Sequence, residues 1–112
     1  MVTASYTTDR DRRGVVVVSV VGELDAYTAP KIRGGLRAAL TDSTTKQLRV
    51  DMAGVSFLDS SGISALIRCQ AEADERGVAL VVVNPQPQPL KVLQIVGLTE
   101  FLGVTTDSEA AG

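Results

Sequence analysis

The chain of 112 residues has no histidine and no tryptophan, a single cysteine, and only two tyrosines and two phenylalanines. Without histidine it can form no Ser-His-Asp triad, no Cys-His pair and no HExxH zinc site. One thiol, that of Cys69, can form neither an internal disulfide nor a cluster of thiolate ligands, which suits a reducing compartment. We therefore expect a protein that is not an enzyme and holds no metal, with Cys69 serving as a small apolar residue.

Charge and hydrophobic runs exclude two further classes of partner. With 11 basic and 13 acidic side chains the net charge is −2, which offers no attraction to the phosphates of a nucleic acid. The longest apolar runs, residues 15–18 and 78–83, are far shorter than the roughly 18 residues that a membrane-spanning helix needs. We expect no nucleic-acid partner, no membrane insertion and, from the lone thiol, a cytoplasmic protein.

The first part of the chain has the pattern of a strand pair. Residues 2–7 alternate between apolar and polar side chains, which predicts a strand with one solvated face. Residues 9–14 are polar and end in glycine, as turns do. Residues 15–21 are almost wholly β-branched, which predicts a strand covered on both faces. The short connection between the two makes them an antiparallel pair.

Beyond this pair, helical and strand spacing alternate. Helices are expected at residues 32–40 and their flanks, at 61–76, and around 90–96. Strands are expected at residues 47–51 and 78–83, with irregular connections at 54–59 and 84–89. Pro30 fits a first helical turn, Thr28 is placed to cap it, and Gly77 is placed to end the second helix.

This order of elements predicts one α/β domain over residues 1–112. Strands that alternate with helices after an antiparallel hairpin form a mixed sheet, here of four to five strands. The fifth would be an edge strand or a final turn at residues 101–104. The helices are too few to cover both faces, so we expect them mainly on one face. Residues 105–112 are small and polar and are expected to be a flexible tail.

Residues 50–67, VDMAGVSFLDSSGISALI, hold the first candidate site. Asp59-Ser60-Ser61-Gly62 opens an amphipathic helix, with Ser60 placed as its N-cap. The N–H groups of Gly62 and Ile63 would then be unpaired, and the glycine would let a partner or a phosphate approach the backbone closely. The alternative is that these residues only cap the helix.

A second candidate cluster, GELDAYTAP, spans residues 22–30 and carries Glu23 and Asp25. It also connects a strand to a helix. In open α/β folds the ends of parallel strands meet at one edge of the sheet, where binding sites lie. We expect the two clusters at the same edge, although a turn followed by a cap would have the same composition.

GELDAYTAP, followed about thirty residues later by VDMAGVSFLDSSGI, resembles the anti-sigma factor antagonists of the STAS domain family. The resemblance covers nearly the whole chain, so it implies a single STAS-like domain. It also implies that Ser60 is phosphorylated by a serine kinase that is itself the anti-sigma factor. Asp25, Asp59, Ser61 and Gly62 would join Ser60 in the partner-binding surface.

The function implied by this resemblance is partner switching. The unphosphorylated chain would bind an anti-sigma factor with a histidine-kinase-like ATPase fold and so release a sigma factor. Phosphorylation of Ser60 would end that binding, and a serine phosphatase would restore it. ATP and magnesium would belong to the kinase, so no cofactor is expected here; the resemblance leaves weak nucleotide binding open.

The sequence also bears on three other functions. Catalysis by Ser60 lacks a nearby base, because Lys46 and Lys91 are distant in sequence. A response-regulator receiver with Asp51 at a strand end would need a lysine after a later strand, where Asn84 and a proline stand instead. A non-switching STAS subunit of a signalling scaffold or a transporter complex stays open.

Overall fold

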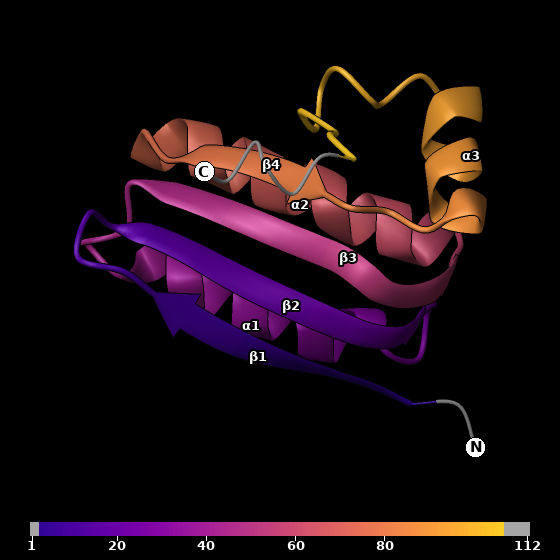
Figure 1. Cartoon of the computed structure of the whole chain (residues 1–112), viewed down its shortest axis with the longest axis horizontal. Helices are drawn as coiled ribbons and strands as arrows, with labels where there is room; N and C mark the ends of the chain where they lie inside the picture. The colour runs from indigo at the N-terminus through magenta and orange to yellow at the C-terminus, as the bar shows by residue number, and fades with distance from the viewer. Residues whose placement is uncertain (1–2, 107–112) are drawn as a thin grey trace.

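A mixed sheet of four strands, in the order β1-β2-β3-β4, is the centre of the molecule (Figure 1). The computed structural model describes residues 3–106. The strands are β1 (Ala4–Arg10), β2 (Val15–Leu24), β3 (Gln47–Leu58) and β4 (Ala79–Val83). β1 is antiparallel to β2, whereas β2, β3 and β4 are parallel to one another. The predicted α/β class, hairpin and mixed sheet are confirmed.

Two long helices, α1 (Ala29–Thr41) and α2 (Ser60–Arg76), cover one face of the sheet (Figure 1). Each connects parallel neighbours, and both connections step across the sheet in the same direction. Because such crossovers are right-handed, both helices must lie on the same face. The short helix α3 (Pro87–Ile95) lies at the end of the sheet, against β3. The prediction of helices mainly on one face is confirmed.

The apolar core lies between this face and the two helices. Val16, Val18 and Val20 of β2 are each at most 1% exposed and point into it. The valines that alternate with them do not: Val15 and Val17 are half-buried and Val21 is 55% exposed. The prediction that residues 15–21 are covered on both faces is therefore wrong. A β-branched run favours a strand, but it does not show how many layers cover that strand.

Strand β3 is longer than the sequence predicts. Residues 54–59 were expected to form a loop, yet β3 continues to Leu58 and pairs with β2 as far as Leu24 opposite Leu58. Two irregularities in the register, after Ser19 and after Gly22, interrupt this pairing without ending it. Turn-like composition was thus overridden by pairing with a neighbouring strand.

The segment after β4 also differs from expectation. α3 begins at Pro87, although residues 84–89 were predicted to be irregular. Prolines are compatible with a first helical turn, since its N–H groups have no partner within the helix. Further on, Thr105 forms an isolated bridge with Val83, so the final segment pairs with the edge of β4. Most of the expected tail, residues 107–112, lies outside the described residues.

Substitution of the adjacent glycines Gly34 and Gly35 of α1 tests how the β1–β2 hairpin packs on that helix. A methyl group at Gly35 would overlap the ring of Tyr6, whereas one at Gly34 would meet nothing within 4 Å. Gly34→Ala should stabilise the domain by about 0.5–1 kcal/mol through helix propensity. Gly35→Ala should instead destabilise it by about 1–3 kcal/mol through overpacking. Urea unfolding of both variants measures this, and an equal response at the two positions would contradict the packing described.

Candidate functional site

The two candidate clusters meet at the edge where the parallel strands end. Leu24 ends β2 and pairs with Leu58, which ends β3, so Asp25 and Asp59 are the next residues on neighbouring strands. The Asp59 N–H donates to the Leu24 carbonyl at 3.2 Å, which holds the two connections together. The expectation that both clusters lie at one edge of the sheet is confirmed.

Asp59, and not Ser60, is the N-cap of α2. Its carboxylate accepts the Ser61 N–H at 2.9 Å and the Gly62 N–H at 3.2 Å. The Ile63 N–H donates to the Asp59 carbonyl at 3.0 Å. The predicted cap and the predicted unpaired N–H groups of Gly62 and Ile63 are therefore wrong. An aspartate one residue earlier outcompetes the serine because its carboxylate suits the positive end of the helix dipole.

Ser60 is consequently free of any structural task. It is the first residue of α2, it is exposed, and its side chain makes no hydrogen bond with another residue in the range 3–106. The Ser60 hydroxyl therefore lies at a helix start that Asp59 stabilises and to which it does not itself contribute.

Gly62 faces the interior rather than a partner. It is buried, and a methyl group there would lie 2.8 Å from the Leu24 carbonyl oxygen and against the Leu58 side chain. The glycine thus lets α2 approach the ends of β2 and β3 closely. The expectation that it leaves the outer surface open to a ligand is wrong, because the space that it leaves is filled by the protein itself.

Asp25 and Thr28 stabilise the other connection. The Asp25 carboxylate accepts the N–H groups of Tyr27 at 2.9 Å and Thr28 at 3.0 Å. The buried Thr28 hydroxyl donates to the Glu23 carbonyl at 2.6 Å and makes no cap bond to α1. Thr28 stands at the start of α1 as predicted, but its side chain closes the turn in front of it. Asp25 therefore shapes this loop, as Asp59 shapes the other.

Two glutamines that sequence reasoning missed tie α3 to this edge. The Gln88 amide oxygen accepts the Leu58 N–H at 2.9 Å, and its amide nitrogen donates to the Leu58 carbonyl at 3.2 Å. Gln86 donates to the Ala53 carbonyl at 2.7 Å. No pattern in the sequence marks this long-range pairing, although two amide side chains among prolines are unusual for a simple connector.

Two exposed aromatic side chains lie near the ends of β2 and β3, and they too were missed. Tyr27, two residues after Asp25, is 75% exposed, and Phe57, two residues before Asp59, is 39% exposed. Two of the four aromatic residues of the chain thus lie close in sequence to the ends of β2 and β3. Exposed aromatics of this kind are characteristic of protein-binding surfaces.

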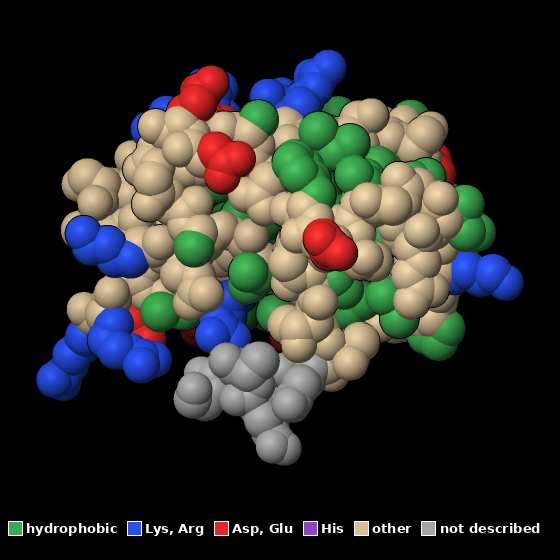
Figure 2. All heavy atoms as spheres, turned by 90° about the horizontal axis from the view of Figure 1, so that it is seen from above, with side chains coloured by type: hydrophobic (Ala, Val, Ile, Leu, Met, Phe, Trp, Pro, Cys, Tyr) green, Lys and Arg blue, Asp and Glu red, His purple; other side chains and the backbone are tan. Residues whose placement is uncertain are grey.

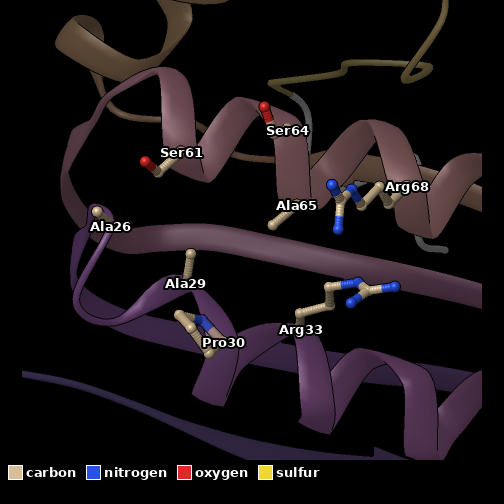
Figure 3. A pocket seen from close by; sticks show the side chains of 8 residues that line it. All are labelled: Ala26, Ala29, Pro30, Arg33, Ser61, Ser64, Ala65 and Arg68. Atoms are coloured by element: carbon tan, nitrogen blue, oxygen red, sulfur yellow. The ribbon is translucent and has the colours of Figure 1, made fainter.

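A groove lies beside this edge, between the first halves of α1 and α2 (Figure 3). Its volume is about 310 Å³. Ala29, Pro30 and Arg33 line it from one side and Ser61, Ser64 and Arg68 from the other. Ser61 thus lies in the groove, directly after Ser60.

Three further features of residues 3–106 bear on functions that the sequence left open. No three His, Cys, Asp or Glu side chains in this range are placed to hold a metal ion. Asp51 lies within β3, opposite Ser19 and Val83, and accepts the Ala53 N–H at 2.9 Å, so it is not the strand-end residue that a receiver needs. None of the helices in the same range is both long and apolar enough to cross a bilayer.

The thiol of Cys69 is inaccessible, which gives a direct test of packing under α2. The side chain is 2% exposed, and burial raises the pKa of this thiol to about 11, against a smaller opposing effect of Arg33. It therefore stays protonated at neutral and mildly alkaline pH, where only the thiolate reacts. A disulfide reagent should label the protein only in denaturant, and rapid labelling of the native protein would contradict the buried position.

The assignment of the cap can be tested by comparing neighbouring residues. Asp59→Ala should lower the free energy of unfolding by about 0.5–2 kcal/mol, the usual cost of losing an N-cap. Asp59→Asn should retain most of it, since the amide oxygen still accepts. Ser60→Ala should change stability by less than about 0.5 kcal/mol, as expected of an exposed side chain without a partner. If Ser60→Ala costs as much as Asp59→Ala in urea unfolding, the cap has been assigned to the wrong residue.

Known proteins are similar to this chain in sequence and in fold. The anti-sigma F factor antagonist of Lysinibacillus sphaericus is 31% identical over 98 residues, which cover 88% of this chain and 84% of that protein. An anti-sigma factor antagonist from Mycobacterium paratuberculosis superposes with a TM-score of 0.82 at 28% identity, over 96% of this chain and 90% of the other.

The anti-sigma factor antagonist SpoIIAA is similar in both of its forms. The unphosphorylated form has a TM-score of 0.78 and the phosphorylated form 0.72, each at 26% identity and over 96% of this chain. The matched residues cover 93% of the unphosphorylated SpoIIAA chain and 96% of the phosphorylated one, so the likeness extends over the whole domain. The model of the STAS domain matches residues 6–111, and the chain therefore belongs to the STAS domain family.

Proposed function

We propose that this protein is an anti-sigma factor antagonist, which binds an anti-sigma factor through the surface around Ser60 and is switched off when Ser60 is phosphorylated. The observation that carries this proposal is the division of roles at the start of α2. Asp59 caps the helix, so the exposed Ser60 hydroxyl is available for modification. The relatives named as anti-sigma factor antagonists support the same role.

The surface around Ser60 suits binding to another protein. Tyr27 is exposed on the connection after β2 and Phe57 near the end of β3, and Ser60 directly precedes Ser61, which lines the groove. Asp25, Asp59 and Gly62 hold the backbone of this surface in place, whereas Ser60 and Ser61 present side chains to it. In such an interface the aromatic side chains supply contact area, while a small residue at the centre leaves room for the partner.

A phosphate on Ser60 would act mainly on binding. It adds a charge of about −1.5 to −2. The start of α2 favours an anion by about 0.3–1 kcal/mol, whereas the Asp59 carboxylate repels it by a comparable amount. The Ser61 and Gly62 N–H groups already donate to Asp59, so the phosphate gains few backbone donors. With these opposing effects the domain keeps its fold.

Inside an interface the same phosphate is costly. Burying a charged group without a basic receptor costs several kcal/mol. About 3 kcal/mol already lowers an affinity more than a hundredfold. The switch therefore needs no internal rearrangement of the domain. A solved phosphorylated form of SpoIIAA shows that a related domain accepts such a group.

The proposed cycle involves two enzymes that act on this chain. The anti-sigma factor would have a histidine-kinase-like ATPase fold and would phosphorylate Ser60 with its own ATP and magnesium. A serine phosphatase would remove the phosphate in the cytoplasm. This chain would hold no cofactor and catalyse no reaction, because its part is to bind.

Mass spectrometry on the protein isolated from its own cells tests the modification. A phosphate on the peptide that contains Ser60, at a level that changes with growth conditions, is the expected result. An unmodified peptide under all conditions would favour a non-switching subunit of a signalling scaffold or transporter complex.

Charge substitution tests the switch itself. Ser60→Asp should weaken binding to the anti-sigma factor purified from the same cells by about tenfold or more, since a charge without a basic receptor enters the interface. Ser60→Ala should bind like the wild type. Ser43→Asp places the same charge on the exposed loop at the far end of the sheet and serves as the matched control. Equal affinities of Ser60→Ala and Ser60→Asp would contradict the proposal.

A further inference from the structure

Two arginines face the groove between α1 and α2 without any partner. Arg33 extends from α1 and Arg68 from α2, and both reach toward the space between the helices (Figure 3). Neither makes an ion pair or a hydrogen bond with another described residue. No acidic side chain lines the groove. Positive charge therefore accumulates here, although the chain as a whole has a net charge of −2.

One turn further along, the same two helices are complementary. Arg37, four residues after Arg33, lies 3.4 Å from the carboxylate of Glu72, four residues after Arg68. Glu72 also pairs with Arg76 at 3.0 Å. By the same spacing, a carboxylate at position 68 would pair with Arg33. Position 68 instead holds a second arginine. Two like charges across a groove repel each other, and an anion bound between them removes that repulsion.

The other residues of the groove suit a small acidic group. Ala29 and Ala65 are short side chains that leave space between the helices, and the volume of about 310 Å³ exceeds that of a single side chain. Ser61 and Ser64 add hydroxyl donors on the α2 side. Guanidinium groups bind carboxylates through paired hydrogen bonds, so two of them with two hydroxyls form a receptor for an acidic side chain.

We infer that this groove binds an acidic side chain, Asp or Glu, presented by the anti-sigma factor beside its contact with Ser60. The inference rests on the proposed function and adds a second point of contact to it. Continuity supports the choice of a protein as the occupant: Ser61 lines the groove, and Ser60 directly precedes it on the same helix. Figure 2 shows a separate gathering of hydrophobic side chains toward the end of the molecule where α3 lies.

The first test removes the charge of the groove and compares it with an equal loss elsewhere. Arg33→Gln/Arg68→Gln should weaken binding to the anti-sigma factor by about tenfold or more, because a buried carboxylate would lose both partners. Arg12→Gln/Lys46→Gln lowers the net charge equally at the far end of the sheet and should leave affinity within about twofold. Equal affinities of the two double variants would overturn the inference while leaving the function proposed for Ser60 intact.

The second test needs no anti-sigma factor, so it separates the groove from the proposed function. A tetraglutamate peptide is titrated into the full chain while the side-chain Nε–H signals of Arg33 and Arg68 are followed by nuclear magnetic resonance. Saturable shifts that disappear in Arg33→Gln/Arg68→Gln support the inference. No shift at either arginine overturns it. Inorganic phosphate is titrated in parallel, and saturation at a lower concentration than the peptide would overturn it in favour of a phosphorylated ligand.

Discussion

The pairing of β2 with β3 up to their last residues is the constraint on which the site depends. Leu24 opposite Leu58 brings both connections to one edge, and the bond from Asp59 to the Leu24 carbonyl fixes their separation. Gly62 then admits α2 to within contact of the same carbonyl. Gln88 also holds Leu58, because its side-chain amide oxygen accepts the Leu58 N–H and its amide nitrogen donates to the Leu58 carbonyl. These contacts fix the position of Ser60, and the side chain of Ser60 takes part in none of them.

The direction of the crossovers decides the rest of the architecture. Because both connections step the same way, α1 and α2 share a face and pack against each other, with the groove between their first halves. The interhelical pair of Arg37 with Glu72 closes that contact further along. The opposite face of the sheet keeps half-exposed valines and polar residues, as expected where no helix covers it. The topology of the sheet therefore places the groove next to the edge where β2 and β3 end.

Sequence reasoning predicted the features that depend on local pattern and order. Helical spacing located α1 and α2, and the order of two motifs placed Asp25 and Asp59 at one edge. It failed where the outcome depends on distant partners. The run at 15–21 has the same composition whether one or two layers cover it, and residues 54–58 became strand because β2 lay beside them. Ser60 and Asp59 are both residues that commonly cap helices, and the sequence alone does not show at which of them α2 begins. The contact of Gln88 with Leu58 spans 30 residues and leaves no local signal.

The separation of the cap from the serine has an evolutionary consequence. Most exposed residues at helix starts are retained partly because the fold needs them, so their presence says little about function. Here the fold needs Asp59, and selection for stability is indifferent to Ser60. Under the function proposed above, a domain in which Ser60 is replaced by a residue without a hydroxyl would keep its fold and lose only its control by phosphorylation. The proposed function therefore accounts for the serine, whereas the fold accounts for the aspartate before it.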